Sequence, residues 1–178
     1  IKPLSAKIGA EVTGADFSKT VPSADLINIK QGLLRHLVMV IRNQSLNPEK
    51  LLAAVRLFGE TMEQHLTDTL MQNHPEIAVL DSSKMPPDKQ NRVIPFGART
   101  WHTDHTNHEC PPKYTALYAV NLPSSGGDTS FANMHFAFAS LPQGEQASLQ
   151  KLQTVNKIED FGYISAEAQI KFGSLPIH

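Results

Sequence analysis

The sequence predicts a mixed α+β fold, and two features lead to that prediction. The first sixty residues contain apolar residues at helical spacing, which is typical of helices with one face on a core. After residue 99, short apolar segments alternate with Pro and Gly turns, a pattern typical of sandwiches, barrels and jelly rolls. A Pro-rich, charged stretch over residues 82–98 separates the two parts. Its length predicts either a lid or binding loop, or a disordered segment.

Composition narrows the class of protein. The chain has 178 residues, which fits one domain. Its 16 Lys and Arg against 17 Asp and Glu give no basic surface for nucleic acid or for an acidic membrane. A single cysteine, Cys110, excludes an internal disulfide framework and a Cys-based zinc cluster. No apolar run approaches the ~18 residues of a membrane span. We therefore expect a cytoplasmic globular protein that binds small molecules, with neither nucleic acid nor membrane as a partner.

Strands and helices alternate in the N-terminal part of the chain. Residues 1–17 predict a strand and a turn, because glycines separate short apolar groups. Ser23 is the predicted N-cap of a helix that runs to about Leu37. The run LVMVI at residues 37–41 is almost wholly apolar and predicts a buried strand.

A second helix is predicted where Asn47 and Pro48 combine an N-cap with Pro at the first helical position. Gly59 can end this helix. Residues 77–80 predict another buried strand, and residues 133–152 return to helical character with a Leu-Pro pair interrupting them. Three further strands are predicted after residue 99, with the sequences RTWHTDHT, YTALYAVNL and DTSFAN.

The most informative motif is His102-Thr103-Asp104. On a strand, residues two apart point to the same face, so the histidine and the aspartate are expected to project together. An imidazole and a carboxylate supply two ligands of a two-His, one-carboxylate arrangement, which leaves three positions open on Fe(II). By itself, the spacing also fits a surface histidine that is hydrogen-bonded to a nearby acid.

The third ligand of such a site has to be another histidine. His105 is expected on the opposite face of the strand, and His108 lies about 20 Å from His102 along an extended chain. Only a sharp turn between residues 104 and 108 would bring His108 to the metal. We therefore expect the third ligand in a distant part of the fold. The other histidines have different expected places: His36 on a helix, His74 in a loop and His135 at the start of a helix.

Residues 101–142 resemble the Fe(II)/2-oxoglutarate-dependent dioxygenases of the taurine dioxygenase (TauD/TfdA) family. The matching pieces are the W-H-T-D opening, a Pro-Pro pair, an L-Y-A-V strand, and P-x-x-G-G-D-T followed by A-N-M. Upstream, I-G-A-E-V-x-G-x-D over residues 8–16 also matches, as does the apolar strand with Arg42 followed by a helix that closes in Phe-Gly. The resemblance implies a distorted double-stranded β-helix, or jelly roll, flanked by helices.

The resemblance also implies roles for individual residues. His102 and Asp104 match the first two iron ligands, which are the catalytic residues of the family. Thr129 matches a threonine whose hydroxyl contacts a carboxylate of 2-oxoglutarate. A hydroxyl at a strand start can donate to a carboxylate, and the two glycines before it permit a tight turn. Trp101 is expected to pack beside the iron strand.

The substrate pocket departs from that of taurine dioxygenase. His65 falls where that enzyme has a sulfonate-contacting histidine, but Ala98 stands where it has a pocket asparagine. Residues 105–108 read His-Thr-Asn-His and give the pocket a more polar mouth. Taurine itself is therefore not the expected substrate.

The implied activity is hydroxylation of a small organic substrate, such as a sulfonate, a sulfate ester or another carboxylate-like compound. Fe(II) would be the metal, with O2 and 2-oxoglutarate as co-substrates and succinate and CO2 as products. Two alternatives use the same residues: a zinc-dependent hydrolase, and a non-catalytic jelly-roll protein that binds a metal or a small molecule. A homodimer or homotetramer is the assembly that the resemblance implies.

The chain boundaries lead to a further expectation. The sequence begins at Ile1 instead of Met and stops in what reads as an extended segment. We expect residues 1–178 to be a single, C-terminally truncated dioxygenase domain. Residues 1–98 would hold the N-terminal helices, strands and pocket loop, and residues 99–178 the first part of the jelly-roll core with its following helices. The third iron-binding histidine and an arginine for 2-oxoglutarate would then lie beyond residue 178.

Overall fold

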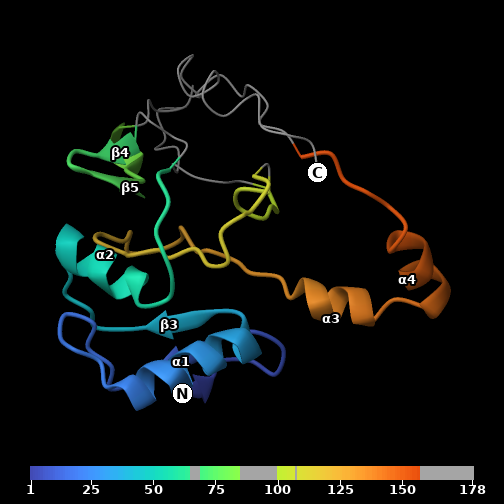
Figure 1. The fold of residues 1–178 in the computed structure, drawn as a ribbon, viewed down its shortest axis with the longest axis horizontal. Coiled ribbons are helices and arrows are strands. Elements are labelled where there is room, and N and C mark those ends of the chain that lie inside the picture. Colours follow the sequence, from blue (N-terminus) through green and yellow to red (C-terminus); the bar gives the residue numbers. More distant parts are fainter. Residues whose placement is uncertain (65–68, 85–99, 107, 157–178) are drawn as a thin grey trace. The chain divides into compact units, whose positions relative to one another are not determined.

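The computed structural model describes residues 1–64, 69–84, 100–106 and 108–156 (Figure 1). The chain divides into two compact units. The first comprises residues 1–59 and 128–152, and the second comprises residues 60–127 and 153–178. The structure confirms a mixed α+β protein. No helix among the described residues is long and apolar enough to cross a membrane.

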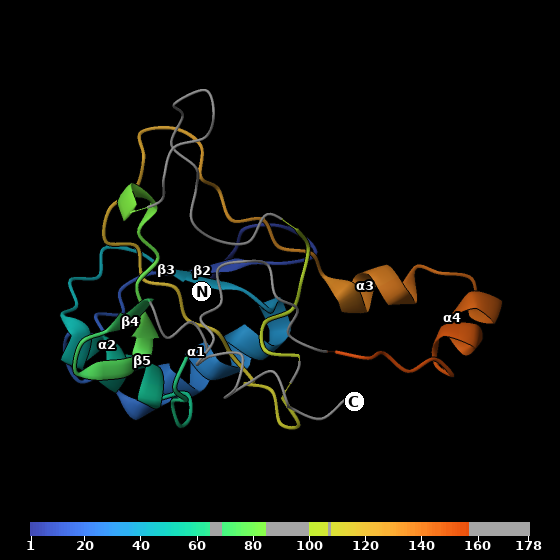
Figure 2. The ribbon, with the colours of Figure 1, turned by 90° about the horizontal axis from the view of Figure 1, so that it is seen from above.

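A three-stranded sheet with the order β1-β2-β3 organises the first unit. Strand β1 (Lys2–Pro3) pairs antiparallel with β2 (Ala10–Val12), and β2 pairs in parallel with β3 (Met39–Ile41). Helix α1 (Ser23–His36) connects the two parallel strands and packs against both, as Figures 1 and 2 show. The predicted strand at residues 37–41 is therefore confirmed, although it is half-buried and two residues shorter at its start.

The ends of α1 differ slightly from the prediction. Pro22 occupies the N-cap position without a side-chain hydrogen bond, so Ser23 is the first residue of the helix and not its cap. Because Pro has a fixed φ and no N–H, it is well suited to this boundary. At the other end, Leu37 takes a left-handed conformation, with φ of 66°, and its N–H bonds to the carbonyl of Leu33 at 2.8 Å.

Helix α2 (Pro48–Arg56) begins as the sequence predicts. The Asn47 side chain accepts a hydrogen bond from the N–H of Lys50 at 2.9 Å, and Pro48 follows the cap. The helix ends at Arg56, before Gly59. Residues of α1, α2 and β2, together with Phe17, form the buried core of this unit: Val12, Phe17, Ile29 and Ala54.

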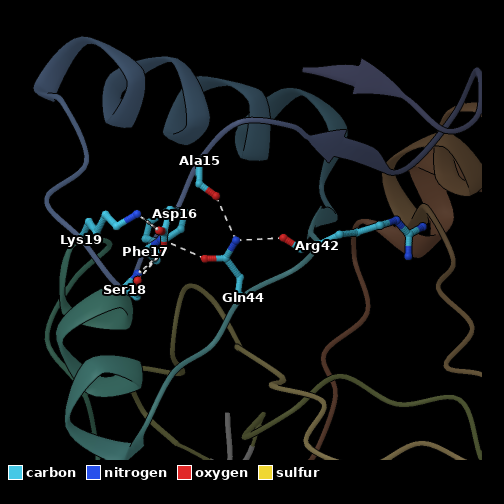
Figure 3. A network of polar contacts seen from close by, with 7 residues as sticks. All are labelled: Ala15, Asp16, Phe17, Ser18, Lys19, Arg42 and Gln44. Atoms are coloured by element: carbon cyan, nitrogen blue, oxygen red, sulfur yellow. Dashed lines mark hydrogen bonds and ion pairs between the residues drawn. The ribbon is translucent and has the colours of Figure 1, made fainter.

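Gln44 fixes the loop that carries Phe17 into this core (Figure 3). Its Oε1 accepts from the N–H of Phe17 at 2.8 Å, and its Nε2 donates to the carbonyls of Ala15 and Arg42, each at 2.9 Å. One side chain thereby joins the loop after β2 to the loop after β3. The ring of Phe17 lies 6.2 Å from that of Phe58, between centroids.

Two short helices belong to the same unit, α3 (Met134–Ala139) and α4 (Gln143–Leu149). The predicted interruption at Leu141-Pro142 is confirmed, because Pro142 takes the N-cap position of α4. His135 lies in the first turn of α3, as expected.

The second unit contains a two-stranded antiparallel hairpin, β4 (Leu70–Met71) with β5 (His74–Ala78), followed by a 3-10 turn, η2 (Ser82–Lys84). Two predictions are corrected here. His74 starts a strand and does not lie in a loop, and the strand ends at Ala78 instead of continuing to Leu80. Its side chains are mostly half-buried. A turn with Asn73 at φ of 66° places His74 opposite Met71. This pairing brings His74 and Pro75, which are typical of a loop in sequence, into strand β5.

The strands predicted from RTWHTDHT, YTALYAVNL and DTSFAN do not form among described residues 100–106 and 108–133. A strand needs a neighbour that supplies its ladder of hydrogen bonds, and no described residue does this for these segments. Their apolar side chains are correspondingly exposed, with Val120 at 87% and Leu122 at 71%. An alternating pattern indicates which side chains would be buried in a sheet, but it does not supply the neighbouring strand that the sheet needs.

Candidate metal centre

His102 and Asp104 lie together in the second unit, although the segment that carries them is not a strand. The Nε2 atom of His102 is 3.0 Å from Oδ1 of Asp104. The chain is irregular at His102 and turns at residues 104–106, where His105 has a φ of 55°. The expected juxtaposition of the two side chains is therefore present, but a turn follows it where strand alternation was predicted.

The separation of these two atoms suits a shared metal ion. Two ligand atoms that each lie about 2.1 Å from a metal, at right angles to each other, are about 3.0 Å apart. The side chains of His102 and Asp104 are 48% and 43% exposed, so an ion and further ligands can approach from solvent. Nitrogen and carboxylate oxygen together form a donor set that divalent iron accepts. The two residues therefore fit a metal of this type.

Each of the two side chains has a second partner on its other polar atom. Nδ1 of His102 lies 2.9 Å from the backbone carbonyl of Thr100. Because a carbonyl can only accept, Nδ1 carries the hydrogen, and with a metal between the two side chains Nε2 would present its lone pair to the ion. The hydroxyl of Thr115 donates to Oδ2 of Asp104 at 3.0 Å. Nε2 and Oδ1 are thus the two atoms that face each other, at 3.0 Å.

The chain does turn sharply between residues 104 and 108, but the turn places His108 against His105. The N–H of His108 bonds to the carbonyl of His105 at 3.1 Å, and the two rings pack edge to face with centroids 5.6 Å apart. Burial lowers the pKa of His105; the charge of Asp104 opposes this shift, and His108 adds to it. Among the described residues, no group of three His, Cys, Asp or Glu side chains could hold a metal.

The structure corrects the expected place of Trp101 and leaves two other residues open. The side chain of Trp101 is 74% exposed and does not pack beside an iron strand, because without a strand there is no second face to direct it inward. His65 and Ala98 lie outside the described residues, as does most of the predicted pocket loop at 82–98.

Thr129 lies on an exposed segment of the first unit. The turn just before it needs glycine, as predicted, because Gly126 and Gly127 have φ values of 72° and 75°. Sequence reasoning did not identify Thr100 and Thr115 as partners of the ligand pair. Spacing gives no signal for Thr115, since its contact depends on how the chain turns after Asp104.

The chain is similar to a known family of dioxygenases along nearly its whole length. The family model for taurine catabolism dioxygenase TauD, TfdA family, matches residues 1–173. An alpha-ketoglutarate-dependent sulfate ester dioxygenase of Pseudomonas putida is 30% identical over 100% of the chain and 56% of its own length. Pentalenolactone F synthase of Streptomyces avermitilis is 36% identical over 76% of the chain and 45% of its own length.

Solved structures lead to the same family. A taurine dioxygenase from Burkholderia xenovorans superposes with a TM-score of 0.71 at 30% identity, covering 89% of the chain and 53% of that structure. The chain thus spans about half the length of the relatives it matches.

Proposed function

The chain belongs to the taurine catabolism dioxygenase TauD, TfdA family, and from this membership we propose that the protein is an Fe(II)/2-oxoglutarate-dependent dioxygenase. The reaction would insert one oxygen atom of O2 into a C–H bond of a small organic substrate. The other oxygen atom would enter succinate as 2-oxoglutarate loses CO2. The observation that carries the proposal is the 3.0 Å separation of His102 Nε2 and Asp104 Oδ1.

His102 and Asp104 are the residues that would hold the iron. The iron would supply the activation of dioxygen that no protein side chain provides. The work of the chain is to present Nε2 and Oδ1 together, and the contacts at Thr100 and Thr115 support that geometry. The hydroxyl of Thr129 would donate to a carboxylate of 2-oxoglutarate, and the exposed segment after Gly126 and Gly127 leaves it accessible.

A sulfate ester, a sulfonate or a similar anionic compound is the substrate class we propose. The relative from Pseudomonas putida, named for sulfate esters, supports this class because its similarity extends over the whole chain. His65 would contact the anionic group of the substrate. We further propose a jelly-roll core, which the TM-score of 0.71 supports, and a cytoplasmic homodimer or homotetramer, which light scattering on the purified protein tests.

Succinate formation by the full-length protein tests the proposal. The enzyme is supplied with Fe(II), 2-oxoglutarate and air, with and without an alkyl sulfate ester. We expect succinate that increases with the ester and disappears in His102→Ala. The matched control is His135→Ala, which removes an exposed histidine of α3 in the first unit and should leave the rate unchanged. Equal succinate formation by wild type and His102→Ala would overturn the proposal. Ester cleavage with Zn(II) in the absence of oxygen would favour a hydrolase instead.

A further inference from the structure

We propose that Thr115 is a positioning residue for Asp104, one that holds the carboxylate so that only Oδ1 is offered to the metal. This inference rests on the proposed function of the site. Its basis is the hydrogen bond from the Thr115 hydroxyl to Oδ2 of Asp104 at 3.0 Å. No motif or comparison assigns a role to this threonine.

The two oxygens of Asp104 have different partners. Oδ1 lies 3.0 Å from Nε2 of His102, and Oδ2 accepts from Thr115. An aspartate carboxylate rotates readily, because the torsion that turns it is broad and two-fold. Without a donor on one side, the group could present either oxygen or both to an ion. A hydroxyl on Oδ2 occupies one oxygen, selects a single orientation and favours binding through Oδ1.

The path of the chain explains how Thr115 reaches Asp104. After Asp104 the chain turns at residues 104–106, and the N–H of His108 bonds back to the carbonyl of His105. Pro111 and Pro112 follow, and their fixed φ angles restrict the returning segment. The contact therefore joins two segments of the second unit whose path is constrained.

The partners of His102 and Asp104 act in the same way. The carbonyl of Thr100 accepts from Nδ1 of His102 and directs Nε2 toward Asp104, and the hydroxyl of Thr115 holds Oδ2 of Asp104 and directs Oδ1 toward His102. Groups of this kind around metal ligands typically change metal affinity 10- to 100-fold when removed. Only the hydroxyl of Thr115 can be removed by substitution, since the carbonyl of Thr100 belongs to the backbone.

The test measures binding of Mn(II) alone to the full-length protein, using the electron paramagnetic resonance signal of the unbound ion. Thr115→Val removes the hydroxyl and keeps the side-chain shape, while Thr115→Ser keeps the hydroxyl. We expect Thr115→Val to weaken Mn(II) binding roughly tenfold or more and Thr115→Ser to remain within about twofold of wild type. Thr20→Val, at an exposed position in the first unit, is the matched control and should bind like wild type.

Wild-type affinity in Thr115→Val would overturn the inference, and so would equal weakening in Thr115→Val and Thr115→Ser. Thr115→Ala provides a second hydroxyl-free variant if Thr115→Val does not fold, and the same outcomes apply to it. The proposed function fails separately: a wild-type protein that binds Mn(II) through His102 but forms no succinate would contradict the dioxygenase and leave the role of Thr115 intact. If removal of His102 leaves Mn(II) binding unchanged, both proposals are wrong.

Discussion

The side-chain amide of Asn133 donates to the backbone carbonyl of Lys7 at 2.6 Å, across 126 residues of sequence. Its oxygen accepts from the N–H of Phe136 at 2.9 Å and so caps α3. The ammonium of Lys7 lies 3.8 Å from the centroid of the Phe136 ring. These contacts attach the start of α3 to the loop between β1 and β2. Thr129 lies on the segment just before them.

Asn133→Ala should destabilise the protein by about 1–2 kcal/mol, because the helix loses its cap and Lys7 loses a donor. Asn133→Ser should cost less, since serine still caps a helix but is too short to reach Lys7. Urea unfolding of the full-length protein measures both, with Asn121→Ala at an exposed position as the control. If the serine and alanine variants were equally unstable, the cap would contribute nothing.

Gln44→Ala should destabilise the first unit by about 1–3 kcal/mol, because the amide makes two partly buried hydrogen bonds, to Phe17 and Ala15, and an exposed one to Arg42. Gln44→Glu keeps the acceptor for Phe17 but loses both donors, so it should also destabilise (Figure 3). Thermal unfolding beside Gln31→Ala, an exposed glutamine of α1, provides the comparison. A Gln44→Ala variant as stable as Gln31→Ala would show that the loops hold without the amide.

Asp16 should give the protein a small stability contribution that depends on pH. Hydrogen bonds from Lys19 and from the side chain and backbone of Ser18 lower the pKa of Asp16 from its ordinary value of 3.8 to about 2. Because the folded-state pKa is the lower one, the contribution is complete above pH 4 and is lost as the pH falls toward 2. The effect is small because both charged side chains reach solvent.

The difference in urea midpoint between wild type and Asp16→Asn measures this contribution. It should be present at pH 6 and shrink at pH 2.5. A difference that is the same at both pH values would assign the effect to something other than the charge of Asp16.

Gly126→Ala should destabilise the protein by about 1–2 kcal/mol, because φ of 72° strains any residue with a Cβ. Beyond the adjoining residues, no atom lies within 4 Å of the added Cβ, so the substitution tests the strain in the backbone and not a steric clash.

Since Thr129 follows this turn, the KM of Gly126→Ala for 2-oxoglutarate should rise while kcat changes little. Gly144→Ala is the matched control: it lies within α4 with open space around it and should stabilise by about 0.5–1 kcal/mol. Equal effects of the two substitutions would contradict the account of the turn.

Local signals in the sequence predicted local structure well. Asn47 and Pro48 start α2 as expected because a cap and a proline act within one helical turn. The glycines before Thr129 have the positive φ angles that their spacing suggested. The strands predicted after residue 99 were wrong among the described residues, because a strand depends on a partner that its own sequence does not specify.

At the candidate metal centre, too, a contact between near neighbours in sequence could be predicted and a contact between distant residues could not. The proximity of His102 and Asp104 could be predicted, since two residues of separation limit how far apart they can lie. The contact with Thr115 could not be predicted, because it depends on a turn at His105, a non-glycine residue with positive φ. Such residues are uncommon, and composition does not mark them.

Oxygen uptake by the full-length protein is the measurement that decides whether His102 and Asp104 hold the iron of a dioxygenase. We expect uptake that requires both Fe(II) and 2-oxoglutarate and that is lost in His102→Ala. Uptake that continues unchanged in His102→Ala, or that does not depend on 2-oxoglutarate, would contradict the assignment of His102 and Asp104 as iron ligands of a dioxygenase.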